Sequence, residues 1–129
     1  MDRLAEIFGK ENVLKDEPMS RHTTFRIGGA ADFFVKVQTI SQLQEAMRYL
    51  KKEQIPFYIV GNGSNLLVKD EGYKGVIIEV NSRISFIDVI GEDIVADAGA
   101  KLSAVAVTAM ENDLGGFEFA HGIPGNIGG

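Results

Sequence analysis

The sequence predicts an α+β fold, and three observations lead to that class. A strand pattern, a helix pattern and a second strand pattern follow one another over residues 31–60, which is the order of a parallel βαβ unit. Residues 84–99 have the alternation and the central glycine of an antiparallel hairpin. A helix pattern over residues 100–114 follows the hairpin. This order differs from the repeating strand–helix order of a doubly wound sheet.

The first third of the chain is predicted to contain one short helix and one strand. Apolar residues have helical spacing over residues 2–8, and Gly9 can end this helix. We expect residues 10–29 to be irregular, because a proline and a glycine pair interrupt them. Residues 31–37 are rich in β-branched and aromatic side chains, which predicts a strand.

A helix and a second strand are predicted next. Ser41 and Gln44 have the spacing of a capping box at the start of the helix. Its expected apolar face consists of Leu43, Ala46, Met47 and Leu50. Residues 56–60 form a continuous apolar run, which is typical of a strand buried on both faces. Such a strand would deliver the glycine loop that follows it to the sheet edge where open α/β sheets bind ligands.

The rest of the chain is predicted to hold a strand, a hairpin and a helix. Residues 75–80 read as a strand, and the hairpin turns near residues 91–93. Gly115 is the expected stop of the helix over residues 100–114. Its apolar face is expected to contain Leu102, Val105, Ala106, Ala109 and Met110. The final fifteen residues hold six glycines and end inside a loop, so we expect this sequence to be part of a longer chain.

Bulk properties exclude several classes of protein. The 129 residues suffice for one domain or two very small ones, and their net charge of −5 argues against nucleic acid as a partner. The absence of cysteine excludes thiol chemistry and makes the cytoplasm the expected compartment. Without a signal peptide or an apolar run of about 18 residues, no membrane association is expected. A monomer is the expected state.

The segment GNGSN, residues 61–65, is the first candidate binding loop. Leu66 stands where a dinucleotide-binding fingerprint needs its third glycine, and no Walker sequence is present. Alternating glycines nevertheless allow successive backbone N–H groups to converge on an anion, and Ser64 and Asn65 add side-chain donors. The residues alone leave a plain turn and a phosphate cradle both open.

The segment GIPGNIGG, residues 122–129, is the second candidate loop. Gly122, Gly125 and Gly128 surround Pro124, which stiffens a path that the glycines leave open to close approach. By itself this loop could be purely structural. Two such loops in one small chain favour a large ligand between them.

Four further side chains carry weaker signals. His22 and His121 are far apart in the sequence, so we expect no metal site and interpret His121 as a hydrogen-bonded loop residue. Phenylalanines flank Glu118, so burial could raise its pKa, although a structural hydrogen bond to a loop amide is the favoured interpretation. Arg26 could reach a phosphate, stack on a ring or remain solvated.

Four segments follow one another along the chain: HTTFRIGGAADFFV, VGNGSNLLVKDEGYKGVII, ADAGAKL and GFEFAHGIPGNIGG. Taken together and in this order, they closely resemble the UDP-N-acetylenolpyruvoylglucosamine reductase family, in the form common in Gram-positive bacteria. The resemblance implies an FAD-binding fold of the vanillyl-alcohol-oxidase type, with FAD between two subdomains. It implies a first subdomain over residues 1–73 and an incomplete second subdomain over residues 74–129, without the substrate domain.

The resemblance also implies which residues would contact FAD. The first loop would cradle the pyrophosphate with Gly61, Asn62, Gly63, Ser64, Asn65 and Leu66. The second loop would line the flavin with Gly122, Ile123, Pro124, Gly125, Asn126 and Gly128.

The activity implied by the resemblance is a reduction in peptidoglycan synthesis. In this family NADPH reduces FAD, which passes a hydride to UDP-N-acetylglucosamine enolpyruvate to give UDP-N-acetylmuramate. The family's serine, arginine and glutamate at the reacting centre match no position here, so we expect no catalytic residue and no activity from this chain alone. Two alternatives are another flavin oxidoreductase of the same fold, such as a 2-hydroxyacid or lactone oxidase, and a non-catalytic flavin- or nucleotide-binding module.

Overall fold

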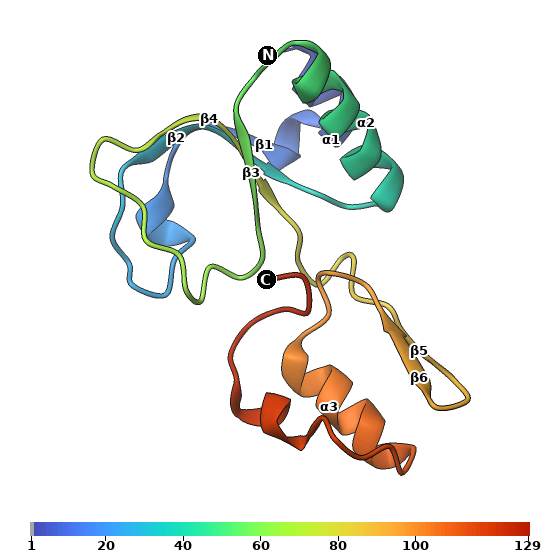
Figure 1. The fold of residues 1–129 in the computed structure, drawn as a ribbon. Coiled ribbons are helices and arrows are strands. Elements are labelled where there is room, and N and C mark those ends of the chain that lie inside the picture. Colours follow the sequence, from blue (N-terminus) through green and yellow to red (C-terminus); the bar gives the residue numbers. More distant parts are fainter. Residues whose placement is uncertain (1) are drawn as a thin grey trace.

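The computed structural model describes residues 2–129, which form two parts joined by a short connection (Figure 1). The first part is a four-stranded sheet with two helices, and the second is a hairpin with one helix. The first part consists of α1 (Asp2–Phe8), η1 (Lys10–Asn12), β1 (Val13–Pro18), η2 (Met19–Arg21), β2 (Ala30–Lys36), α2 (Ile40–Lys52), β3 (Phe57–Val60) and β4 (Tyr73–Glu79). The second part consists of β5 (Ile87–Ile90), β6 (Asp93–Ala96), α3 (Leu102–Glu111) and η3 (Glu118–Gly122).

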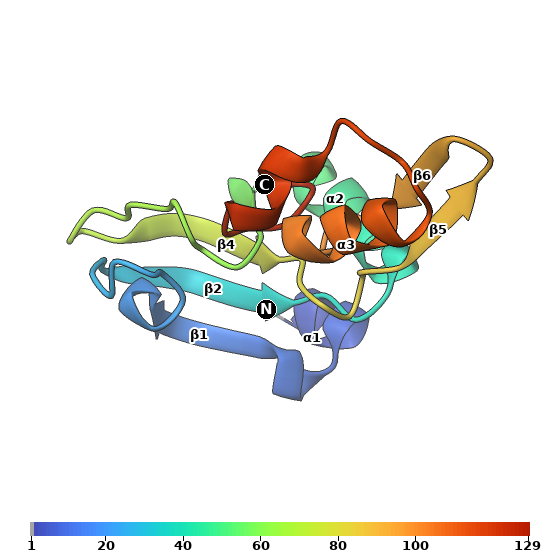
Figure 2. The same ribbon diagram turned by 90° about the horizontal axis from the view of Figure 1, so that it is seen from below.

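The strands of the first sheet lie in the order β1-β2-β4-β3, with β1 antiparallel to β2 and the other neighbours parallel. Figure 2 shows β1, β2 and β4 running side by side. The chain therefore passes from β2 through α2 to β3, and β4 later fills the space between the two strands. Strand β1 lies in the segment expected to be irregular, so that expectation was wrong. The rest of the predicted α+β order is confirmed.

Strand β3 is an edge strand, which corrects the expectation of a strand buried on both faces. Tyr58 and Ile59 are 54% and 42% exposed, whereas Val76 and Ile78 of the central strand β4 are fully buried. A continuous apolar run predicts a strand with apolar side chains on both faces. It does not distinguish a central strand, covered on both faces, from an edge strand that lines a cleft. The apolar residues of β3 are consequently free to line a cleft.

The core of the first part lies on both faces of the sheet. On one face, residues of α1 and α2, including Phe8 and Leu50, pack against Val35 and Ile78. On the other face, Met19, Ala31, Phe34, Val60 and Ile77 form a second cluster. Neighbouring residues of a strand point to opposite faces, so the apolar runs of β2 and β4 supply both clusters at once.

The helix ends differ in detail from the predicted ones. Thr39, not Ser41, caps α2: its Oγ1 accepts the Gln42 N–H at 3.2 Å, and the Gln42 side chain accepts the Thr39 N–H at 3.3 Å. The capping-box spacing is therefore met by Thr39 and Gln42, two residues before the predicted pair Ser41 and Gln44.

Helix α3 ends before the predicted stop at Gly115. Asp113 takes the left-handed conformation at φ 55°, and the Leu114 N–H donates to the Ala109 carbonyl at 2.9 Å. This is the Schellman arrangement with aspartate in the place usually taken by glycine. Met110 is 69% exposed, so it does not belong to the buried face of α3.

The division into subdomains after residue 73 stays a prediction. Strand β4 pairs with β2 and β3, so residues 73–79 complete the first sheet. We propose that the division follows β4, because a cut at residue 73 would separate the central strand from its partners.

We predict that Phe34→Ala lowers the free energy of unfolding by about 3–5 kcal/mol, because it leaves a cavity beneath the sheet. Phe34 is fully buried, whereas Phe86, the matched control, is 66% exposed. Phe86→Ala should change the free energy by about 0.5 kcal/mol or less in the same urea titration. Equal losses for the two variants would contradict the assignment of the core.

Candidate functional site

A cleft of about 340 Å³ lies between the loop after β3 and the C-terminal segment. Residues of β3, both glycine loops and the start of α3 line it: Tyr58, Ile59, Val60, Gly61, Asn62, Gly63, Ser64, Asn65, Leu66, Leu102, Ile123, Pro124, Gly125, Asn126 and Gly129. The structure therefore brings the two predicted loops together around one hollow. No side chain of this lining carries a formal charge.

Ten of the twelve predicted site residues line the cleft, and Gly122 and Gly128 do not. Gly128 packs instead against Ala98, where an added Cβ would lie 2.7 Å from the Ala98 Cβ. The role of these two glycines toward a ligand stays a prediction. Sequence reasoning missed Tyr58, Ile59 and Leu102, because their apolar patterns were assigned to buried element faces.

The side-chain amide of Asn126 joins three segments at the floor of the cleft. Its Oδ1 accepts the Asn62 backbone N–H at 2.8 Å, and its Nδ2 donates to the Gly99 carbonyl at 2.7 Å. Asn126 is only 6% exposed, and its hydrogen bond to Gly99 is shielded from water, whereas the one from Asn62 is partly buried. The amide thereby fixes the first glycine loop relative to the second.

Further hydrogen bonds reinforce this link. The Ser64 hydroxyl donates to the Pro124 carbonyl at 3.3 Å, directly between the two loops. Asn62 Oδ1 accepts the Ser64 N–H at 3.2 Å and so closes a tight turn inside the first loop. The second loop is held to α3, because the Leu102 N–H donates to the Gly125 carbonyl at 3.1 Å.

Two glycines of the first loop are required by close packing. Gly63 has φ 67°, and an added Cβ would overlap the carbonyl of His22. An added Cβ at Gly61 would lie 2.6 Å from Asn126 Oδ1. These two glycines therefore allow the first loop to pack closely against His22 and Asn126, and they leave its backbone open to a ligand.

Several backbone N–H groups at the cleft are free to bind an anion. Among residues 2–129, no acceptor takes the N–H of Gly63, Asn65 or Leu66 in the first loop, nor that of Gly125 in the second. Free amides that converge on one hollow are suited to a phosphate. The cleft thus combines neutral donors with an apolar wall from β3.

Glu118 lies outside the cleft and has a structural role, as favoured from the sequence. Both of its carboxylate oxygens accept the Gly116 N–H, at 3.0 and 2.9 Å. This hydrogen bond holds the pKa of the Glu118 carboxyl below its usual value. Burial does not raise this pKa, because the side chain is exposed.

The two histidines are separate in the structure as well. His22 Nε2 lies 3.0 Å from Glu17 Oε1, and its ring stacks on Phe34 with 3.8 Å between centroids. His121 is exposed in η3. Within residues 2–129, no three histidine or acidic side chains gather as a metal site would require.

The family of FAD binding domains matches residues 31–129. The chain belongs to this family. FAD is therefore the cofactor, and the cleft fits it, because the glycine cradle and the free amides suit a diphosphate.

Curated relatives cover nearly the whole of this chain. The UDP-N-acetylenolpyruvoylglucosamine reductase of Clostridium kluyveri is 46% identical over 98% of this chain and 41% of its own length. The relative of the same name from Caldanaerobacter subterraneus is 46% identical over 100% of this chain and 42% of its own length. The chain thus spans about two fifths of these relatives, and the resemblance seen in the sequence is confirmed.

Solved structures confirm the predicted fold. The UDP-N-acetylenolpyruvylglucosamine reductase of Thermus caldophilus superposes with a TM-score of 0.70 at 32% identity, over 88% of this chain and 39% of its own. The 4-ethylphenol oxidase of Gulosibacter chungangensis superposes with a TM-score of 0.64 at 17% identity, over 87% of this chain and 24% of its own. These likenesses support an FAD-binding fold of the vanillyl-alcohol-oxidase type. Within residues 2–129, no helix is long and apolar enough to cross a membrane.

We predict that Asn126→Ala lowers the free energy of unfolding by about 1–3 kcal/mol, because the buried Gly99 carbonyl and the partly buried Asn62 N–H lose their partner. The Asn62 amide should also exchange its hydrogen faster, as measured by NMR. Asn65→Ala is the control, since Asn65 is exposed. Unchanged protection of Asn62 in Asn126→Ala would contradict the proposed link.

The pH dependence of Glu118 follows from its lowered pKa. The folded pKa lies below the unfolded one, so this group stabilises the fold above the unfolded pKa and loses that contribution as pH falls through the folded pKa. The Gly116 amide shift in NMR should therefore titrate below the ordinary value of 4.5. Glu118→Gln should abolish this transition, and a midpoint above 4.5 would refute the hydrogen bond.

Proposed function

We propose that this chain is the FAD-binding part of a UDP-N-acetylenolpyruvoylglucosamine reductase. The observation that carries the proposal is the cleft between the two linked glycine loops, in a chain 46% identical to reductases of that name. The whole protein would reduce the enolpyruvyl group of UDP-N-acetylglucosamine enolpyruvate with NADPH, in peptidoglycan synthesis. We place it in the cytoplasm as a monomer that binds a nucleotide sugar, without nucleic acid or membrane as a partner.

The residues of this chain would bind and orient the cofactor. The free amides of Gly63, Asn65 and Leu66 would donate to the diphosphate, and Ile123 and Pro124 would face the remainder of FAD. Tyr58 and Ile59 would cover an apolar part of it and keep water away. The flavin itself supplies the hydride-transfer chemistry when bound.

No residue of this chain is assigned to the reacting centre. Glu118 is engaged with Gly116 in a hydrogen bond outside the cleft. We propose that the proton donor of the reduction lies outside residues 1–129. An oxidase of the same fold remains the alternative, but its support at 17% identity is limited to the fold.

We predict that Gly61→Ala weakens FAD binding about tenfold or more, which corresponds to about 1.4 kcal/mol. The added methyl group would push the Asn126 amide away and distort the first loop. Flavin fluorescence during titration with FAD measures the dissociation constant. Gly115→Ala is the matched control, because a Cβ there meets no atom closer than 3.5 Å. Equal affinities of the two variants would argue against the cleft as the FAD site.

A second measurement separates cofactor binding from turnover. The full-length protein containing this sequence should oxidise NADPH in the presence of the enolpyruvyl nucleotide sugar, and the 129-residue chain should not. Turnover by the chain alone would contradict the assignment of the reacting centre to the uncovered part. Failure of the wild-type chain to bind any FAD would contradict the proposed function itself.

A further inference from the structure

A second hollow of about 470 Å³ adjoins the cleft on the other side of Asn62. It lies beyond the carboxyl ends of β3 and β4, is open to solvent, and is bordered on one side by the segment that follows η2. Its lining consists of Arg21, His22, Thr23, Thr24, Arg26, Asn62, Glu79 and Asn81. Asn62 is the residue that the two linings share.

The two hollows differ in charge. The cleft has no charged side chain, although a diphosphate carries negative charges that need compensation. The second hollow has two arginines, Arg21 and Arg26. Guanidinium groups are the side chains best suited to bind phosphate, because they donate several hydrogen bonds in a fixed plane. A cationic hollow thus lies directly beside an uncharged cleft that suits a diphosphate.

The turn that carries Arg26 is fixed to the cofactor loop. Within this turn, residues 23–27, the Arg26 N–H donates to the Thr23 carbonyl at 3.1 Å, and the Thr23 hydroxyl donates to the Ile27 carbonyl at 3.1 Å. The Thr24 N–H donates to the Gly63 carbonyl at 3.0 Å. Movement of Gly63 must therefore move the turn, and the position of Arg26 is tied to that of the glycine cradle.

Arg26 adopts a backbone conformation that disfavours any residue other than glycine. Its φ is 54°, in the left-handed region. Among residues 2–129, Arg26 has no ion-pair partner, whereas Arg21 lies 3.7 Å from Glu17. Arg26 is thus the better placed of the two to meet an external anion.

Glu79 is the one carboxylate of the hollow, and a neighbouring amide engages it. Asn81 Nδ2 donates to Glu79 Oε2 at 2.8 Å, which takes up part of its hydrogen-bonding capacity. The hydroxyl of Thr24 and the amide of Asn62 add uncharged polar groups. The hollow therefore retains a cationic side formed by Arg26 and its turn.

We propose that this hollow is an anion subsite in which Arg26 binds a phosphoryl group next to the FAD cleft. This inference rests on the proposed function, since it takes the cleft as the FAD site. The phosphoryl group comes either from the diphosphate of FAD itself or from a second nucleotide bound at the same time. Both the dinucleotide and the nucleotide sugar of the proposed reaction carry such groups.

The test variant is Arg26→Gly, which removes the guanidinium and relieves the unfavourable φ at once. A purely structural residue would give an unchanged or higher Tm and unchanged ligand binding. We expect the unchanged or higher Tm together with phosphoryl binding that is about tenfold weaker. Gln54→Gly is the matched control: Gln54 has the same φ of 54° at the end of α2 and lines neither hollow.

Three ligands distinguish the sources of the phosphoryl group. FAD and riboflavin are titrated by fluorescence, and inorganic pyrophosphate is titrated by calorimetry into the free and the FAD-saturated chain. Weaker FAD binding by Arg26→Gly, with riboflavin binding unchanged, assigns the subsite to the diphosphate of FAD. Unchanged FAD binding with weaker pyrophosphate binding to the FAD-saturated chain assigns it to a second nucleotide.

The inference is overturned if Arg26→Gly matches the wild type with all three ligands. Equal losses for FAD and riboflavin would also overturn it, because riboflavin has no phosphate. A wild-type chain that bound pyrophosphate but no FAD would refute the proposed function, while the pyrophosphate titration would still test Arg26. The failures of the two proposals are therefore distinguishable.

Discussion

The buried amide of Asn126 is the interaction on which the cofactor cleft depends. One side-chain group accepts from Asn62 and donates to Gly99, and so ties the first part of the molecule to the second. An amide suits this position because it offers a donor and an acceptor at fixed separation, without a charge to desolvate. A carboxylate of the same shape could accept from Asn62 but would face the Gly99 carbonyl without a proton. Asn126 thus supplies the more buried of the two hydrogen bonds that join the glycine loops, and Ser64 supplies the other.

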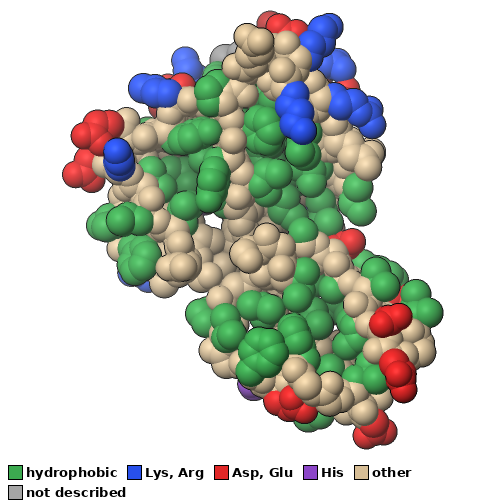
Figure 3. Space-filling model, in the orientation of Figure 1, with side chains coloured by type: hydrophobic (Ala, Val, Ile, Leu, Met, Phe, Trp, Pro, Cys, Tyr) green, Lys and Arg blue, Asp and Glu red, His purple; other side chains and the backbone are tan. Residues whose placement is uncertain are grey.

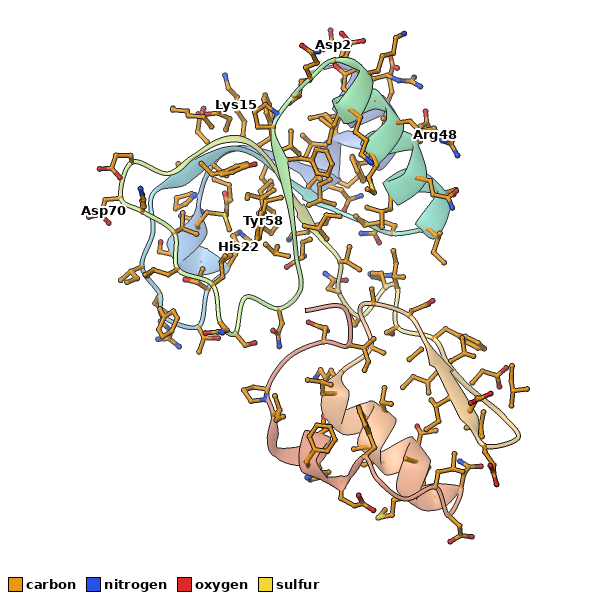
Figure 4. The ribbon with its side chains drawn as sticks, in the orientation of Figure 1. Asp2, Lys15, His22, Arg48, Tyr58 and Asp70 are labelled. Atoms are coloured by element: carbon orange, nitrogen blue, oxygen red, sulfur yellow. The ribbon has the colours of Figure 1, made fainter. Side chains whose placement is uncertain are left out.

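Charge is distributed to leave this cleft neutral. On the face drawn in Figure 3, basic and acidic side chains both lie over the first part, whereas the second part shows acidic side chains only. Residues 81–129 hold only two basic residues, Arg83 and Lys101, so the second loop can offer an anion little beyond backbone amides. The first part supplies the arginines of the proposed subsite, in the segment of His22, which Figure 4 labels. His22 belongs to the segment that carries Arg21 and Arg26, and its ring is anchored on Phe34 and Glu17.

Strand order explains why a cleft exists at this place. Because β4 occupies the centre of the sheet, β3 is left at the edge with Tyr58 and Ile59 uncovered. The loop after β3 meets the second part where the Asn62 N–H donates to Asn126. It then returns along the sheet to β4, and Leu66 and Val68 pack against the second core cluster. The same apolar residues that would have been core in a central strand become the wall of a binding site. The proposed cofactor site therefore uses apolar side chains of β3 that would be buried in the core if β3 were a central strand.

The sequence by itself determined the helices, most strands, the hairpin and the two loops, because periodicity and turn residues act over a few neighbours. It also pointed to FAD through the combined motifs. Only the tertiary structure decided the edge position of β3, the strand β1, and the capping residue Thr39. It alone decided the contact between Asn62 and Asn126, which lie 64 positions apart. A hydrogen bond between distant residues leaves no pattern in the neighbouring sequence. It depends on how two separately folded segments are placed, which residues close to each partner do not encode.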